Sequence, residues 1–317
     1  MNGTASPLSE RYAYARKANL PLTRLQSRTI AEVYRALADR RLEFAAPSPC
    51  LLCGERGHRL LAERDRYGLP VRTVVCEGCG LLRSDPVLTP PSLASFYASH
   101  YRALHEGRSA AAGAAARFAR PRRNGRRVLG RLQESGQAFG LARGLELLQG
   151  EAPAALAQWL AGRGLKADVV ILRHVVEHLV DPAPFLRQLQ PLLGTRGVLY
   201  VEVPGLRMLA EGKKGYDFLS YLMLPHYERT TLERLLAQAG YASRSCNEEI
   251  WGVFEAMPSS VQAPAARRLD ATEVIEFLRH VEGLRQRHRR PVPWRQVRDG
   301  ARRVATTLGA IAVRGGR

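Results

Sequence analysis

The sequence predicts an α/β fold that is preceded by a small cysteine-rich module and followed by a helical tail. Two short apolar runs rich in β-branched residues, Asp168–Leu172 and Gly197–Val203, flank a helical pattern, as in two buried parallel strands joined by a crossover helix. Two identical cysteine pairs lie upstream of these runs, and two further helical patterns lie downstream, at 271–284 and 295–312. These three observations set the order of the modules along the chain.

The chain is long enough for one α/β domain and smaller modules, because 317 residues with 45% apolar content can bury a sizeable core. An N-terminal helix is predicted near Ile30–Phe44, and an aromatic-rich helix at Leu93–Leu104. We expect five segments: an N-terminal helical segment at 1–48, a metal-binding module at 49–90, a helical linker at 91–127, an α/β domain at 128–262 and a basic helical tail at 263–317.

The net charge and the hydropathy of the chain indicate which kinds of binding partner to expect. Forty-eight basic residues against 29 acidic ones give a net charge of +19, and all but four of the basic residues are arginine. Such an arginine excess in an alanine-rich chain is typical of GC-rich codon usage, so charge alone does not indicate a nucleic-acid partner. The sequence has no apolar run long enough for a membrane span and no segment of signal-peptide type. We expect a cytoplasmic protein.

The two cysteine pairs have the spacing of a zinc site. Each pair has two intervening residues and is followed by a glycine, which supplies the positive φ that a tight knuckle needs. Four thiolates fill a tetrahedral shell and leave no position for water, so a structural zinc is predicted. The alternative is two pairs of buried, unligated thiols. The ligands are predicted to be Cys50, Cys53, Cys76 and Cys79.

Polar side chains follow the first predicted strand, where open parallel sheets bind ligands. The segment Ala167–Pro182 contains the strand and then Arg173, His174, Glu177 and His178. If this segment is already helical, the two histidines and Glu177 share one face, because they are three and four residues apart.

This segment resembles the fourth strand and following helix of the class I S-adenosylmethionine methyltransferases, in which a valine-rich strand precedes a Glu-His pair and an Asp-Pro. The resemblance continues through Pro184–Leu193, the turn at Gly194–Gly197 and the strand at Val198–Pro204. Further on, Leu224–Tyr241 is similar to the family's segment in which a histidine precedes an amphipathic helix, and His226 takes the histidine position. The apolar pattern itself predicts this helix at Thr230–Ala239, with Gly240 as its C′ glycine. The resemblance implies a Rossmann-like methyltransferase sheet and S-adenosylmethionine as cofactor.

A cysteine-rich module in front of such a domain is similar to the deoxysugar C-methyltransferases, in which a Glu-His pair does acid-base work. By this resemblance Glu177, His178 and His226 are the catalytic candidates, and a sugar or small metabolite is the substrate class. Methylation next to a ketone requires a base to form the enolate, and histidine titrates near neutral pH. The alternative is that the histidine only holds the loop.

The first half of the sheet departs from the family's pattern. The glycine-rich turn that lets the backbone approach the cofactor is absent in its usual form, and Arg127–Arg143 is too short for two strands and a helix. The sheet is therefore predicted to be incomplete in its first half. Gly144–Gly150 resembles a third strand. The cofactor-binding candidates are Gly136, Gly140, Gly144, Glu151, Arg173 and His174.

Three functions remain open on the sequence. The first is an active S-adenosylmethionine-dependent methyltransferase with a rebuilt cofactor pocket, and the second is an inactive relative that binds or assembles other proteins. The third, a basic zinc-ribbon protein that binds nucleic acid, is supported only by arginine runs that are more often a solvated surface. The Glu-His pair favours the first function, and the missing glycine turn favours the second.

Overall fold

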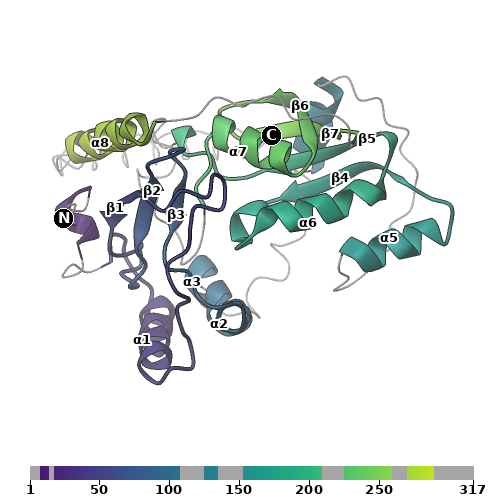
Figure 1. Cartoon of the computed structure of the whole chain (residues 1–317). Coiled ribbons are helices and arrows are strands. Elements are labelled where there is room, and N and C mark those ends of the chain that lie inside the picture. Colours follow the sequence, from purple (N-terminus) through teal and green to yellow (C-terminus); the bar gives the residue numbers. More distant parts are fainter. Residues whose placement is uncertain are drawn as a thin grey trace, which may run out of the picture.

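The computed structural model describes residues 8–13, 18–107, 125–134, 153–208, 225–258 and 270–288. They form two β-sheets, a small antiparallel sheet near the N-terminus and a larger mixed sheet, with helices packed on both (Figure 1). An α/β fold with an N-terminal four-cysteine module is thereby confirmed.

The small sheet consists of β1 (His58–Ala62), β2 (Thr73–Cys76) and β3 (Leu82–Ser84) in that order, with both pairs antiparallel. All four residues of β2 are buried, because the strand lies in the centre and is covered by other elements. A strand buried on both faces reads as a continuous apolar run, and Val74 and Val75 provide one here.

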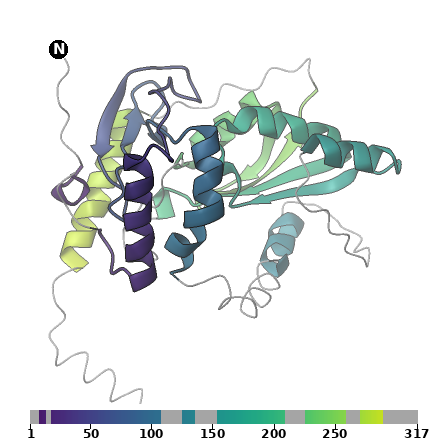
Figure 2. The ribbon, with the colours of Figure 1, turned by 90° about the horizontal axis from the view of Figure 1, so that it is seen from below.

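The N-terminal helix α1 spans Arg24–Ala38 and so begins and ends earlier than the predicted Ile30–Phe44. Thr23 and Gln26 form a capping box that starts the helix, and Arg40, whose φ is 56°, lies just beyond its end. The predicted aromatic helix is present as α2 (Pro90–Phe96), a π-helical turn at Tyr97–Tyr101 and α3 (Arg102–Glu106). The two helical segments lie side by side below the small sheet (Figure 2) and share an apolar cluster.

The larger sheet has the order β4-β5-β7-β6. Its strands are β4 (Ala167–Arg173), β5 (Leu193–Glu202), β6 (Tyr241–Cys246) and β7 (Trp251–Ala256). β4 and β5 are parallel, as predicted, and β7 joins β5 and β6 antiparallel. Opposite β4 the pairing passes from Leu193 directly to Val198, so the predicted turn at 194–197 is a local excursion inside β5.

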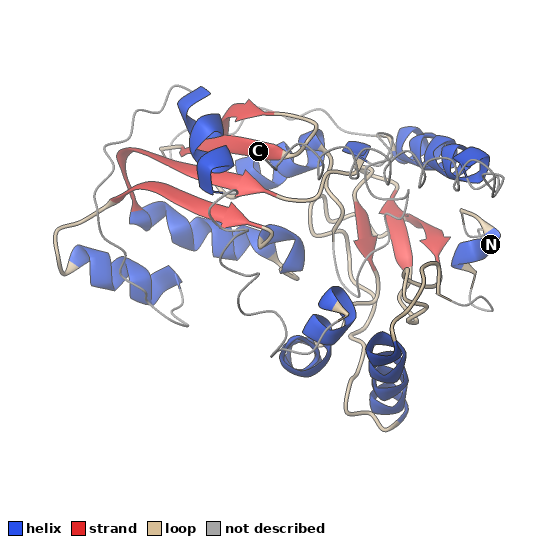
Figure 3. Cartoon of the chain, turned by 180° about the vertical axis from the view of Figure 1, so that it is seen from behind, coloured by secondary structure: helices blue, strands red, loops and turns tan. Residues whose placement is uncertain are grey.

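Helices cover both faces of this sheet. On one face lie α6 (Pro182–Leu189) and α7 (Arg229–Gln238), with α5 (Pro153–Ala161) beside α6. A short helix at residues 125–134 lies on the other face (Figure 3), where Val128 and Leu132 contact Val198, Tyr200 and Val253. Gly240, at φ 82°, ends α7 as the predicted C′ glycine.

β4 forms one edge of the sheet. Within the described ranges no strand pairs with its outer side, where the first half of a complete sheet of this type would continue. The incompleteness of the first half of the sheet stays a prediction, because part of the chain before β4 is not among the residues described. The candidate strand at 144–150 lies outside them.

The knuckles of the cysteine module pack in the same buried core as the α/β half. Leu52, Leu81 and three of the cysteines share one buried cluster with Leu172 of β4 and Leu235 of α7. Two hydrogen bonds cross the same boundary, from Gln238 Nε2 to the Leu52 carbonyl (2.7 Å) and from the His226 N–H to the Leu82 carbonyl (2.8 Å). The two modules therefore support each other.

The C-terminal helix is a packed element and only in part the basic tail that was predicted. α8 spans Ala271–His288 and buries Val274, Leu278 and Val281 against the small sheet and Tyr12. The second helical pattern, at 295–312, lies outside the described residues. No helix in the described part of the chain is both long and apolar enough to cross a bilayer.

Candidate functional site

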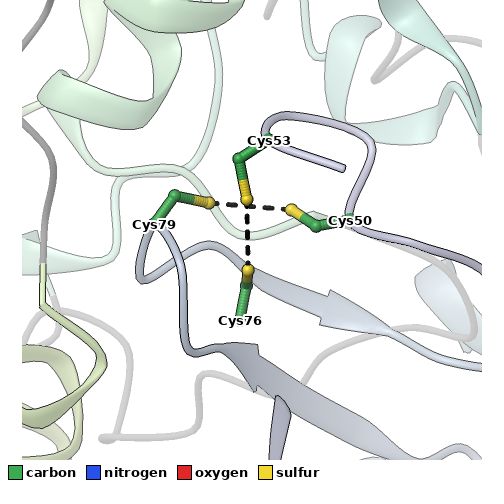
Figure 4. A group of neighbouring side chains, drawn as sticks. All are labelled: Cys50, Cys53, Cys76 and Cys79. Atoms are coloured by element: carbon green, nitrogen blue, oxygen red, sulfur yellow. Dashed lines mark hydrogen bonds between the residues drawn. The ribbon is translucent and has the colours of Figure 1, made fainter. Parts of the chain in front are cut away.

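The four predicted zinc ligands come together at the boundary between the small sheet and the α/β core (Figure 4). All four Sγ atoms lie within 4.8 Å of one another, with 3.6 Å between Cys50 and Cys79 and 3.4 Å between Cys53 and Cys76. Tetrahedral zinc–thiolate bonds of about 2.3 Å place sulfurs about 3.8 Å apart. The donor set and its spacing therefore fit zinc.

The backbone forms the two knuckles in the same way. The N–H of Gly54 donates to the Cys50 carbonyl (2.8 Å), and the N–H of Gly80 donates to the Cys76 carbonyl (2.9 Å). Both glycines have positive φ, 75° and 68°, as the sequence predicted. His58, a possible substitute ligand, does not belong to the cluster; its Nδ1 lies 3.0 Å from the Arg56 carbonyl.

The second set of candidate residues lies at the carboxyl end of β4. The chain leaves the strand through His174, whose φ is 54°, and makes a 3-10 turn at Val176–His178 before α6 begins at Pro182. The segment is not yet α-helical here, so the condition under which His174, Glu177 and His178 would share one helical face is not met. The turn nevertheless brings the three side chains together.

Glu177 is the centre of this group. Its side chain is only 4% exposed, and its Oε1 lies 3.0 Å from His174 Nδ1 and 3.9 Å from His178 Nε2. The second carboxylate oxygen, Oε2, is buried and has no hydrogen-bond partner among the described residues. A buried carboxylate oxygen without a donor is costly, so a ligand or water is expected to donate to it.

The sequence did not predict that Tyr97 and Tyr101 contact His178. Tyr97 Oη lies 2.6 Å from His178 Nδ1, and the rings of Tyr97 and Tyr101 both meet the His178 ring edge to face. Tyr101 also stacks on His105. The π-helical turn that carries both tyrosines could have been a signal, since such turns are frequent at functional sites, but it cannot be read from the sequence.

Burial shifts the pKa values of His178 and Tyr97 and so determines which of them carries a proton at neutral pH. It lowers the pKa of His178, although the Glu177 charge acts in the opposite direction, and it raises the pKa of Tyr97. His178 is therefore mainly neutral and Tyr97 protonated at neutral pH, so the phenol can donate to Nδ1. Burial, with the Glu177 charge, also raises the pKa of Tyr227, a buried phenol without a described hydrogen-bond partner.

His226 lies at the junction with the small sheet. Its backbone forms an isolated antiparallel β-bridge with Leu82, and the backbone of Tyr227 forms a parallel β-bridge with Gly205. Neighbouring side chains of an extended segment point to opposite sides, so His226 is directed away from the side on which Tyr227 approaches Glu177. The described hydrogen bonds and ion pairs of Glu177 and His178 join these two residues to each other, to His174 and to Tyr97.

The junction predicts an acid-sensitive stability. Burial lowers the pKa of His226 to about 4, below the ordinary 6.5, so the unfolded chain binds this proton more tightly. The stabilisation is complete above about pH 6.5 and is lost as the pH falls towards 4, by roughly 3 kcal/mol for this group. We expect His226→Gln to flatten this loss in urea unfolding followed from pH 7 to 4. His280→Gln, on the exposed side of α8, is the control, and an equal effect of both changes would contradict the assignment.

A second charged group surrounds Glu202 at the end of β5. Its carboxylate pairs with Arg127 (2.7 Å), Arg131 (3.2 Å) and Arg173 (3.2 Å), and it accepts from Tyr200 (3.1 Å). Burial alone would raise the pKa of Glu202, but the arginines bring it below its usual range. Of the predicted cofactor residues, Arg173 is therefore engaged by Glu202 and His174 by Glu177.

The remaining cofactor candidates, Gly136, Gly140, Gly144 and Glu151, lie outside the described residues. The described residues provide only the β4 and β5 side of a cofactor site. No glycine-rich turn and no ribose-binding acid of the family's type is found among them, so they do not fit S-adenosylmethionine by themselves.

Part of the chain matches the model of a known protein family. Residues 103–245 match the model of a methyltransferase domain. The matched part covers less than half of the chain and contains β4, β5 and the Glu177–His178 turn. No curated protein matches the chain. The four-cysteine module precedes the matched residues along the chain.

Proposed function

We propose that the chain is a methyltransferase that acts on a carbon acid of a small molecule, such as a keto sugar, with His178 as its base. One observation carries this proposal: His178 lies at the carboxyl end of β4 between a phenol, Tyr97 Oη at 2.6 Å, and a buried carboxylate, Glu177 at 3.9 Å. Removal of a weakly acidic proton requires a base that is held in a fixed position. Here hydrogen-bonding or charged partners hold the imidazole on both sides.

The three side chains form a short relay. As the substrate C–H bond breaks, its electrons pass to the neighbouring carbonyl and the proton goes to the Tyr97 oxygen, which hands its own proton to His178 Nδ1. Glu177 then stabilises the imidazolium that forms. S-adenosylmethionine, when bound, supplies the methyl group.

His226 has no place in this relay, and its catalytic role stays a prediction from the resemblance. The same is true of Arg173 and His174 as cofactor contacts. An inactive relative is the second function, because the described sheet is incomplete and these two side chains are already engaged.

Cofactor binding separates the two functions. We expect calorimetric titration of the zinc-loaded chain to give micromolar affinity for S-adenosylmethionine or S-adenosylhomocysteine, followed by methyl transfer to one of a panel of keto sugars. Absence of both heat and thermal stabilisation at millimolar cofactor would overturn the enzyme proposal and leave a binding protein on a methyltransferase fold. Adenosine alone serves as the control ligand.

A further inference from the structure

Two buried polar groups near His178 have no hydrogen-bond partner among the described residues. One is Oε2 of Glu177, whose side chain is only 4% exposed. The other is the phenol of Tyr227, a residue that is fully buried. A buried donor or acceptor that stays unpaired costs free energy comparable to a lost hydrogen bond. The fold is therefore expected to pair both groups.

The two groups lie in the same part of the core. Tyr227 belongs to one buried cluster with Leu172 of β4 and with Val176, the neighbour of Glu177 in the 3-10 turn. The backbone of Tyr227 is held beyond the end of β5, where the Leu206 N–H donates to the Tyr227 carbonyl (3.0 Å). Burial, with the negative charge of Glu177, raises the pKa of Tyr227. The phenol therefore keeps its proton at neutral pH and is able to donate.

The hydrogen-bonding characters of the two groups are complementary. An ionised carboxylate oxygen only accepts, whereas a protonated phenol donates. Oε1 of Glu177 is already turned to the histidines, at 3.0 Å from His174 Nδ1 and 3.9 Å from His178 Nε2. Oε2 is thus left for a further donor, and a hydrogen bond to a charged acceptor is stronger than one between neutral groups.

We propose that Tyr227 is a positioning residue of the His178 site, whose phenol donates to Glu177 Oε2 directly or across one water molecule. This inference rests on the proposed function, because its consequence is the orientation of Glu177 beside the base. A carboxylate that is held at both oxygens stays in place while His178 takes up a proton and becomes charged. Tyr227 acts on His178 only through Glu177.

Replacement of Tyr227 by Phe tests the hydrogen bond through the sign of its effect on stability. Phe keeps the ring that fills the core and removes only the hydroxyl group. If the phenol donates to a carboxylate, Tyr227→Phe should lower the Tm of the full, zinc-loaded chain by about 3 °C or more. An unchanged or raised Tm would show that the phenol has no acceptor and would overturn the proposal.

A second background shows whether Glu177 is the acceptor. In a Glu177→Leu chain the carboxylate is gone, so Tyr227→Phe should no longer lower the Tm. Tyr241→Phe is the matched control, because Tyr241 is also buried and its Oη donates to the Leu186 carbonyl (2.9 Å). This control should lower the Tm by the same amount with and without Glu177. Equal losses for Tyr227→Phe in the two backgrounds would contradict the assignment of Glu177 as its acceptor.

The titration of His178 tests the positioning role, to which a merely structural hydroxyl would not contribute. The Glu177 charge favours the imidazolium of His178, so a carboxylate that is held less firmly should favour it less. We expect Tyr227→Phe to lower the pKa of His178 in a nuclear magnetic resonance titration, and Tyr241→Phe to leave it unchanged. An unchanged pKa of His178 in Tyr227→Phe would overturn the positioning role. None of these readouts requires turnover, so they decide the inference even in a chain that transfers no methyl group.

Discussion

Removal of zinc is expected to unfold both modules together. Cys50, Cys76 and Cys79 are part of the same buried cluster as Leu172 and Leu235 of the α/β half. Without the metal the knuckles lose the ion that holds four thiolates within one shell, and structural zinc contributes on the order of 10 kcal/mol in small zinc modules. We expect Cys79→Ala or chelation to cost at least ~4 kcal/mol, a decrease in Tm of roughly 10 °C.

Two probes measure whether the loss is shared. Far-ultraviolet circular dichroism follows the whole fold. In a chain that carries Trp159→Phe and Trp294→Phe, the fluorescence of the remaining Trp251, which stacks on Tyr200 in the larger sheet, follows the α/β half. Cys246→Ala is the control. This partly buried thiol is not one of the four grouped cysteines, so its replacement should leave one bound zinc per chain. A chelated chain whose Trp251 signal still unfolds at the original temperature would show that the modules are independent.

The second large effect is expected at His178. Replacement by Asn keeps a polar side chain of similar size but removes the base, so kcat/KM should fall by about 10²–10⁴. Because burial lowers the pKa of His178, the wild-type rate should be constant near neutral pH and decrease only as the pH falls through this lowered pKa. Rate measurements from pH 5 to 8 with the substrate identified by the panel check both expectations.

Two variants separate catalysis from loop support. Tyr97→Phe should lower kcat by removing the phenol that passes the proton, with little change in KM. Glu177→Gln should lower the pKa of His178 in a nuclear magnetic resonance titration, because the carboxylate favours the imidazolium. Turnover of His178→Asn within about tenfold of the wild type would mean that the histidine only holds the turn.

Local patterns predicted the elements well where one residue type sets a backbone state. The glycines after each cysteine pair, Gly54 and Gly80, have the positive φ that the knuckles need, and Gly240 ends α7. Apolar periodicity placed β4, β5 and α7 to within a few residues. It misplaced α1, because the helix start depends on the Thr23–Gln26 capping box and not on the apolar pattern.

The candidate site was predicted only in part. The Glu177–His178 pair was visible as a motif, but Tyr97 and Tyr101 come from a helix distant in the sequence, and nothing local indicates that they meet His178. The sequence left open whether the segment with His174, Glu177 and His178 is helical, and the structure has a 3-10 turn there because α6 begins only at Pro182.

The sequence by itself determined the four-cysteine module and the parallel pair β4–β5. These features depend on spacing, composition and length, which are local properties. Only the tertiary structure decided that the knuckles lie in the α/β core, that α8 covers the small sheet, and that Tyr97 completes the His178 site. Such contacts join residues far apart in the chain, and the burial and hydrogen bonding that hold them are properties of the folded surface as a whole.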